Sequence, residues 1–431
     1  MAFSKDFVWC VGGAAAQQDG GYLDGGKGLH IWDALSDGHI KNSDDCHVAC
    51  DHYHRWQDDL KLLKEIGVNS YRFSISPARI YPSDEFTVND QGVKFYIDLV
   101  NELEKLGIEP ICTLYHWDLP LWLYNKGGWK TSLAVEWFER YTKTIVDAIS
   151  DKVKYWITFN EPQIFVGHGY KTGEHAPFEK LPENDIINIS RNVMKAHGKA
   201  VRAIRKYSKK NAKIGFASTC DILLPNENNN EDKAYETTFD ISRNGVYNPA
   251  WWCDPMLAGK APKGCDWLSE SDLKEIYEPL DYCAYNIYRA DIAKGYDYTY
   301  TGMPHTAIGW TVTKDCLYVS AKYMYKRYGL PIFITENGMA NIDFVYEDGK
   351  VHDPQRSEYL KTHIRGLKKA SDEGVPVIGY SCWSFMDNFE WAEGYDKRFG
   401  LVYVDYRTQE RIVKDSAYTY RDIIKTNGEN L

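Results

Sequence analysis

The chain has 431 residues, of which 44% are hydrophobic and 14% aromatic, and its formal net charge is −10 at pH 7. This apolar content is enough for a large core, and the acidic balance argues against nucleic acid or an anionic membrane as a partner. The sequence has no apolar run of the roughly 20 residues that a membrane-spanning helix requires.

Short apolar runs, typical of strands buried on both faces, alternate with amphipathic helical stretches along the chain. The predicted strands cover residues 7–16, 68–76, 108–117, 153–161, 213–220, 281–288, 331–336 and 376–385. The predicted helices cover residues 52–66, 93–106, 133–149, 186–207, 317–328, 358–371 and 418–425. Residues 20–48, 225–232, 248–265, 289–311 and 387–408 are expected to be irregular loops or short hairpins.

A strand followed by a helix, repeated along the whole chain, predicts an α/β protein of the (β/α)8 type, a TIM barrel with extended βα loops. The sequence contains no evident linker, so we expect residues 1–431 to form a single catalytic domain.

The N-terminal apolar run is short for a signal peptide, and Lys5 and Asp6 precede it, so we expect a strand there. Half of the ten cysteines lie inside predicted strands: Cys10, Cys112, Cys220, Cys283 and Cys382. Cysteines in such runs are typical of buried free thiols, which favours a cytoplasmic protein without disulfides.

Two predicted strands end on a glutamate that is followed by a turn. Residues 156–162 read WITFNEP and contain Glu161, and residues 331–338 read PIFITENG and contain Glu336. A carboxylate at a strand end is better placed for a cleft than for a core, and a pair of them favours glycoside hydrolysis. On spacing alone, two unrelated surface acids remain the alternative, because the chain has 61 acidic residues.

In a (β/α)8 barrel the catalytic residues come from the C-terminal ends of the strands. The side chains expected there are Gln17, Arg72, His116, Trp117, Asn160, Glu161, Asn286, Tyr288, Glu336 and Trp383. Amides, an imidazole, aromatic rings and two carboxylates suit a neutral polyhydroxylated ligand. The set contains no Cys/His group with the spacing of a metal site.

Seven motifs, taken together and in order, resemble glycoside hydrolase family one, the retaining β-glucosidase family, over nearly the whole chain. TFNEP at 158–162 resembles the acid/base motif, and ITENG at 334–338 resembles the nucleophile motif. The others are ACDHYHR at 49–55, YRFSIS at 71–76, YHWDLP at 115–120, WSFMDNFEW at 383–391 and KRFGL at 397–401.

The resemblance implies that Glu161 is the general acid/base and Glu336 the nucleophile. It implies glycone binding by Gln17, His116, Trp117, Asn160, Tyr288, Trp383, Glu390 and Trp391. Arg72 and Asn286 would support the nucleophile, and no cofactor or metal would be needed. The implied activity is that of an exo-β-glucosidase that removes terminal non-reducing β-D-glucosyl residues from small β-glucosides. Members of this family often also accept galactosides and fucosides.

Two other functions are open at this point. A 6-phospho-β-glycosidase of the same family would carry a serine-containing phosphate-binding segment where this chain has Phe389, Glu390 and Trp391, and Glu390 would repel a phosphate. A sugar-binding protein without turnover is the second alternative, although both glutamates are present.

Several positions depart from the usual family pattern: Gln18 and Asp19 beside Gln17, Pro77, Thr219, and Thr311 with Val312 after Trp310. They surround the expected site, and the aglycone preference therefore stays open. The GxxxxGK stretch at 21–27 lacks the Ser or Thr that follows in a phosphate-binding loop. The spacing of Cys46, Cys50, His52 and His54 does not match a zinc motif well.

Overall fold

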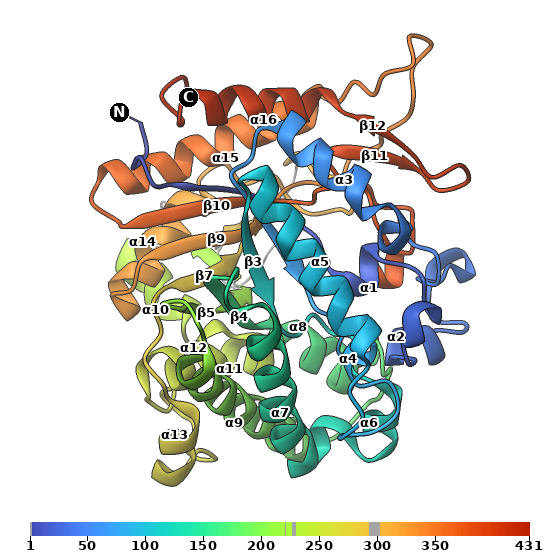
Figure 1. Ribbon diagram of the computed structural model, residues 1–431. Coiled ribbons are helices and arrows are strands. Elements are labelled where there is room, and N and C mark those ends of the chain that lie inside the picture. Colours follow the sequence, from blue (N-terminus) through green and yellow to red (C-terminus); the bar gives the residue numbers. More distant parts are fainter. Residues whose placement is uncertain (1, 220, 226–229, 293–301) are drawn as a thin grey trace.

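The computed structural model describes residues 2–219, 221–225, 230–292 and 302–431. Eight parallel strands close into a barrel in the order β1-β10-β9-β7-β5-β4-β3-β2, which follows the chain around the barrel (Figure 1). The strands are β1 (Val8–Gly12), β2 (Ser70–Ser74), β3 (Glu109–Thr113), β4 (Tyr155–Asn160), β5 (Lys213–Thr219), β7 (Cys283–Asn286), β9 (Ile332–Asn337) and β10 (Val377–Trp383). The predicted (β/α)8 barrel is therefore confirmed.

Long helices cover the outside of the barrel (Figure 1). They are α3 (His52–Ile66), α5 (Asp90–Leu106), α7 (Ser132–Ile149), α9 (Glu183–Tyr207), α14 (Cys316–Tyr328), α15 (Pro354–Asp372) and α16 (Asp415–Lys425). All seven predicted helices are present, and the ends differ by a few residues. In α3, Leu60, Leu63 and Ile66 are buried on one face, and Gly67 ends the helix at a φ of 80°, a conformation that glycine adopts without strain.

The interior of the barrel is filled by side chains that point inward from alternate strand positions. They form a separate apolar cluster of Val8, Cys10, Ile111, Ile157, Ala217, Tyr282, Ala284 and Phe333. The larger core lies between the strands and the helices. The barrel is thus a packed scaffold, and the residues beyond its C-terminal ends are free to form a site.

Short elements occupy the βα loops. The helices are α1 (Ala15–Gln18), α2 (Ile31–Ala34), α4 (Pro77–Ile80), α6 (Leu121–Asn125), α8 (Pro162–Val166), α10 (Glu231–Thr238), α11 (Ile241–Asn244), α12 (Pro249–Ala258) and α13 (Glu270–Ile276), with a π-helix, η4 (Gly167–Thr172). Outside the barrel, β6 (Ile222–Leu224) pairs with β8 (Ala290–Ile292), and β11 (Val402–Asp405) forms a hairpin with β12 (Glu410–Val413).

Three sequence predictions need correction. Ala15 and Ala16, expected in the first strand, begin α1, because the chain turns over the barrel mouth after Gly12. Residues 248–265, expected to be irregular, contain the buried helix α12. This helix is buried on nearly all sides and contains Pro255, so it has little of the polar–apolar periodicity that marks a surface helix. The pair β6–β8 was also not predicted.

The cysteines that the structure describes are all free, and all of them except Cys265 are buried. The predicted thiols Cys10, Cys112, Cys283 and Cys382 are thus confirmed, whereas Cys220 lies outside the described residues. Among the described helices, none has both the length and the apolar character needed to cross a membrane.

Candidate active site

A cavity of about 950 Å³ lies beyond the C-terminal ends of the barrel strands. Ten of the predicted site residues line it: Gln17, His116, Trp117, Asn160, Glu161, Tyr288, Glu336, Trp383, Glu390 and Trp391. Arg72 and Asn286 do not line the cavity, but both hydrogen-bond to residues that do. The structure therefore brings the whole predicted set together at one site.

Glu336 lies near the end of β9, where both of its carboxylate oxygens accept strong hydrogen bonds. The Arg72 guanidinium donates to Oε1 at 2.5 Å, and the Tyr288 hydroxyl donates to Oε2 at 2.6 Å. Burial, followed by the nearby charge of Glu336, raises the pKa of Tyr288 well above its usual value, so the phenol stays protonated and remains a donor. These two donors stabilise a negative charge on Glu336 and fix its orientation.

Glu161 directly follows β4 and occupies the position before the first turn of α8, with Pro162 at the first helical residue. Its φ is 44°, a left-handed conformation that is uncommon for a residue other than glycine and often marks a functional position. Its Oε1 accepts one hydrogen bond, from Asn286 Nδ2 at 2.8 Å. Burial, and then the charge of Glu336, raises the pKa of Glu161 well above the usual range of a glutamate.

The amide of Asn160 is held in one orientation by three neighbours. Its Oδ1 accepts from Arg72 Nη2 at 2.6 Å and from Asn286 Nδ2 at 2.9 Å. Its Nδ2 is therefore the donor to His116 Nε2, at 3.0 Å. Burial and the charge of Arg72 lower the pKa of His116 well below its usual value, so the imidazole is neutral.

Asn286 was predicted to support Glu336, but its side chain hydrogen-bonds to other residues. Its side chain donates to Glu161 and Asn160, and its Oδ1 accepts from Thr335 at 2.7 Å. Asn286 is the register partner of Glu336 through the backbone pairing of β7 with β9. It therefore links the segments that carry the two glutamates, and its side chain serves Glu161.

Glu390 and Gln17 form a polar corner of the cavity. Gln17 Nε2 donates to the Phe389 carbonyl at 2.9 Å and to Glu390 Oε2 at 3.5 Å. Burial, and then the charges of Glu336 and Glu393, raise the pKa of Glu390 to about 8. The side-chain oxygen of Gln17 is buried and has no partner among the described residues, so it is available to a ligand hydroxyl.

Aromatic rings form the wall beside this corner. The Trp117 and Trp391 rings are 4.5 Å apart between centroids, and His116 stacks against Trp383 at 5.9 Å. Trp117 also donates from Nε1 to the Asn160 carbonyl at 2.9 Å. Rings that are fixed in this way present flat apolar faces to a ligand.

The rest of the cavity lining was not predicted as a site. It includes His39, Gln163, His168, Glu174, His175, Asp221, Asn244, Tyr247, Arg289, Ile308 and Glu393, together with Thr219, where the sequence departs from the family pattern, and Trp310, which precedes the departures at Thr311 and Val312. Most of these residues lie on loops and short helices, where periodicity carries no signal. Only the departures at Thr219 and near Trp310 pointed to this region.

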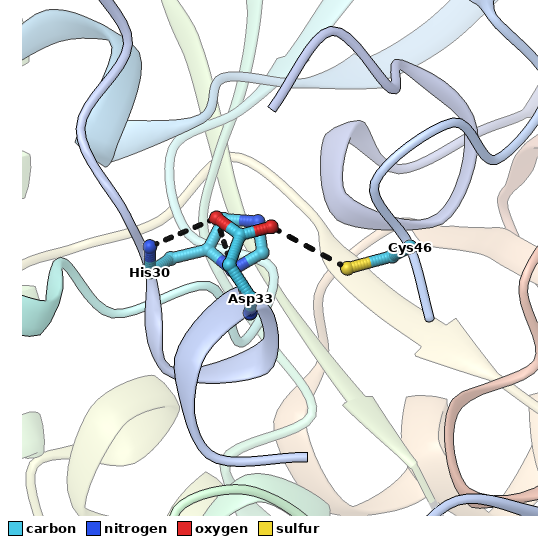
Figure 2. A group of neighbouring side chains, drawn as sticks. All are labelled: His30, Asp33 and Cys46. Carbon is cyan, nitrogen blue, oxygen red and sulfur yellow. Dashed lines mark hydrogen bonds and ion pairs between the residues drawn. The ribbon is translucent and has the colours of Figure 1, made fainter. Parts of the chain in front are cut away.

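One group of possible metal ligands was considered from the sequence, and the structure brings a second group together. Cys50, His52 and His54, considered above with Cys46, hydrogen-bond to separate partners: the Asp387 carbonyl, Asp59 and Asp51. His30, Asp33 and Cys46 do converge (Figure 2). However, the Lys27 ammonium donates to Asp33 at 2.6 Å, and His30 Nδ1 accepts from the Asp33 amide. The Asp33 carboxylate and His30 Nδ1 are therefore already engaged, and the Lys27 ammonium beside Asp33 would repel a metal ion.

A closed (β/α)8 barrel with two buried carboxylates in one cavity provides the pair of groups that glycoside hydrolysis uses. Sequence comparison agrees, because the family model described as glycosyl hydrolase family 1 matches residues 1–429. The chain belongs to this family and is a glycoside hydrolase.

Individual relatives match over the full length. A protein of Thermotoga maritima named β-glucosidase A is 39% identical, covering 99% of this chain and 98% of its own. A protein of Bacillus subtilis named aryl-phospho-β-D-glucosidase BglC is 34% identical, covering 100% and 98%. A solved structure of the Thermotoga maritima β-glucosidase with castanospermine has a TM-score of 0.92 at 39% identity, covering 99% of both chains.

Proposed function

We propose that the protein is a retaining exo-β-glucosidase that acts on small β-D-glucosides. The observation that carries the proposal is the contrast between two buried carboxyl groups in one cavity. Glu336 accepts from a guanidinium and a phenol, whereas Glu161 has one amide donor and a raised pKa. One group is suited to attack as an anion and the other to deliver a proton.

In the first step, Glu336 attacks the anomeric carbon and forms a glycosyl ester while Glu161 protonates the departing glycosidic oxygen. The nearby charge of Glu336 helps keep the proton on Glu161 before the reaction. Once Glu336 is esterified, this charge is gone, and the pKa of Glu161 falls. Glu161 then removes a proton from water, which attacks the anomeric carbon and displaces the Glu336 carboxylate. This second inversion releases the sugar with its original configuration.

The glycone would be held by the residues that the resemblance assigned to it. Asn160, oriented by Arg72 and Asn286, would reach the 2-hydroxyl, and Gln17 and Glu390 would bind hydroxyls at the polar corner. Trp383 would lie beneath the sugar ring. The supporting evidence is their common position around one cavity and the fixed orientation of the Asn160 amide.

We also propose that residues 1–431 act as one catalytic domain and that the protein is cytoplasmic, with a small glycoside as its substrate. The buried free thiols among the described cysteines support a reducing compartment.

The proposal is tested with an aryl β-D-glucoside and its 6-phosphate, assayed side by side. Hydrolysis of the free glucoside with an initial product of β configuration is expected. Hydrolysis of the 6-phosphate alone would instead establish the phospho-glycosidase alternative, although Glu390 faces the cavity where the phosphate would bind. Binding of glucose-like ligands without turnover would establish a sugar-binding protein.

A further inference from the structure

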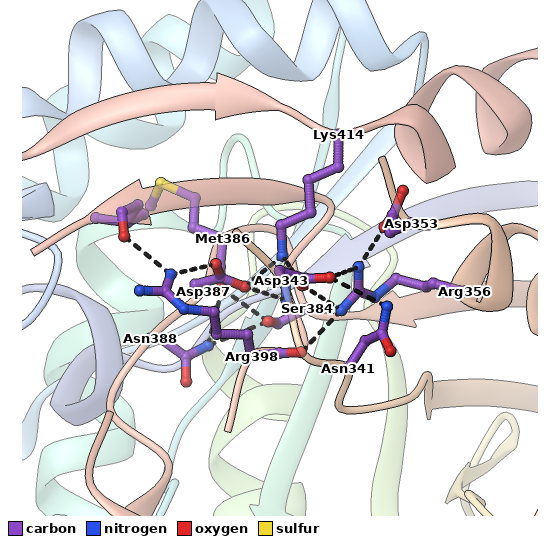
Figure 3. Close-up of polar contacts among 12 residues, drawn as sticks. Asn341, Asp343, Asp353, Arg356, Ser384, Met386, Asp387, Asn388, Arg398 and Lys414 are labelled. Atoms are coloured by element: carbon purple, nitrogen blue, oxygen red, sulfur yellow. Dashed lines mark hydrogen bonds and ion pairs between the residues drawn. The ribbon is translucent and has the colours of Figure 1, made fainter. Parts of the chain in front are cut away.

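A network of buried charges joins the segments after β9, β10 and β12 to the start of α15 (Figure 3). The side chains of Asp343, Asp353, Arg356, Asp387 and Lys414 are completely buried, and that of Arg398 is 17% exposed. Three acids thus face three bases, and the network is neutral as a whole.

The six residues come from segments that are distant in sequence. Asp343 follows β9, Asp353 and Arg356 belong to the start of α15, and Lys414 follows β12. Lys414 Nζ bridges Asp343 at 2.7 Å and Asp387 at 2.6 Å. Arg356 pairs with Asp343 and with Asp353. The network therefore ties the ends of three elements to the loop after β10.

Asp387 is the member of this network that precedes the cavity-lining residues Glu390 and Trp391 in the same segment. Its Oδ1 accepts from Lys414 Nζ and from the Gly400 amide at 2.9 Å, and its Oδ2 accepts from Arg398 at 2.7 Å. The segment 387–391 then leads to Glu390 and Trp391, and its next two residues, Asn388 and Phe389, accept from Gln17. Asp387 itself does not line the cavity.

Buried ion pairs are a poor source of stability, because apolar residues of similar volume often serve equally well. Their hydrogen bonds are directional, however, so a network with all its charges paired can hold a loop in one geometry. Residues 387–390 lie outside the regular elements, and their backbone amides make three hydrogen bonds that hold them: from Asp387 to Val402, from Phe389 to Gln17 and from Glu390 to Gly394. The side-chain contacts of Asp387 add the only ion pairs that the charge network makes to this segment among the described residues.

We propose that Lys414 and Asp387 are positioning residues for Glu390 and thereby determine selectivity for the hydroxymethyl side of the glycone. The proposal rests on the function proposed above, with Glu390 accepting hydrogen bonds from the 4- and 6-hydroxyls of the glucosyl unit. Neither residue touches the substrate, and both act through the placement of the segment 387–391.

The test uses Lys414→Met, which removes the charge and leaves an unbranched side chain that is one atom shorter. We compare kcat/KM for an aryl β-D-glucoside and an aryl β-D-xyloside, which lacks the hydroxymethyl group. Above about pH 8, where the Glu390 carboxyl is charged, the ratio of the two values is expected to fall by about tenfold, the effect of one misplaced hydrogen bond to a charged group. In the background of Glu390→Gln, Lys414→Met should change the ratio little further, because the two residues act in series.

Two further variants separate positioning from stability. Arg327→Met breaks another largely buried ion pair, with Asp254, between residues that do not line the cavity. It should lower the thermal midpoint and leave the glucoside-to-xyloside ratio unchanged. If Lys414→Met does not fold, the double variant Lys414→Met/Asp387→Asn, which removes one charge of each sign, replaces it with the same expected fall in the ratio.

An equal loss on both substrates, or independent effects of Lys414→Met and Glu390→Gln, would overturn the proposal. So would a comparable change of the ratio in Arg327→Met. Failure of the proposed function looks different, since the wild-type protein would then hydrolyse neither substrate.

Discussion

Glu161 and Glu336 carry the same chemical group but have different neighbours. Arg72 and Tyr288 donate to both oxygens of Glu336, while Glu161 accepts one hydrogen bond from Asn286. The pKa of Glu161 is raised first by burial and second by the charge of Glu336. A raised pKa means that the group keeps its proton to higher pH, as a general acid must.

The pKa of Glu161 should therefore fall when Glu336 is esterified. We expect this in enzyme trapped with a 2-deoxy-2-fluoroglucosyl group, because the repulsion between the carboxylates is removed while the burial remains. The measurement is a titration of carbon-13-labelled glutamate carboxyls by NMR in free and trapped enzyme. In the free enzyme, kcat/KM should decline as the pH rises through the raised pKa of Glu161, because the general acid then loses its proton. Identical titration of Glu161 in both forms would contradict the coupling.

At the polar corner, the pKa of Glu390 is raised to about 8, so its carboxyl is charged above that pH. There Glu390→Gln should lower kcat/KM on glucosides by roughly ten- to a hundredfold, since a hydrogen bond to a charged group is worth about 1.5–3 kcal/mol. Steady-state kinetics on an aryl β-D-glucoside measures the effect. Glu358→Gln on the exposed face of α15 is the matched control and should be neutral. Unchanged kinetics in Glu390→Gln would remove Glu390 from the site.

At the scale of elements, the helices that the sequence predicts well are those with one apolar face and a clear end. Helix α3 is an example: it has the buried stripe of Leu60, Leu63 and Ile66 and is followed by Gly67, and its observed range is the predicted one, residues 52–66. The helix α12 has no polar face, and its apolar residues therefore look like loop or strand. The cavity-lining residues His168, Asp221 and Arg289 lie on loops or short elements without such periodicity, which explains why they were not predicted.

Helix α5 allows the scaffold to be tested separately from the site. Leu103 is fully buried in its last turn, which leads into the N-terminal end of β3, opposite the cavity. Leu103→Ala should reduce the free energy of unfolding by about 2–5 kcal/mol through lost burial and a residual cavity. Denaturant titration measures this, with the exposed Lys105→Ala as a control that should change it little. At temperatures where the variant is folded, its kcat/KM should match wild type, and a large loss of kcat/KM would contradict this separation.

At the scale of the whole molecule, the number and order of strand and helix patterns were sufficient to predict the closed barrel. Barrel closure also predicts that Glu161 after β4 and Glu336 at the end of β9 reach the same end of the barrel. The detailed partners were beyond the sequence, because hydrogen bonds such as those from Asn286 to Glu161 and Asn160 depend on strand register and rotamers.

The free cysteines give a prediction for the whole fold. A reducing agent should leave the thermal midpoint unchanged, because the described cysteines form no disulfide that it could break. Thermal unfolding with and without dithiothreitol is the measurement. A drop of several degrees on reduction would reveal a structural disulfide and argue against a reducing compartment.

The central claim is that Glu336 attacks the sugar and Glu161 transfers the proton. The most direct test is the anomeric configuration, read by NMR, of the glycosyl azides that Glu161→Ala and Glu336→Ala form from a substrate with a good leaving group. Glu161→Ala should still form the glycosyl-enzyme, and azide, which needs no base, should release the β-azide after two inversions. In Glu336→Ala, azide should fill the vacated space, attack directly and give the α-azide. The opposite pair of configurations would contradict the account and exchange the two roles.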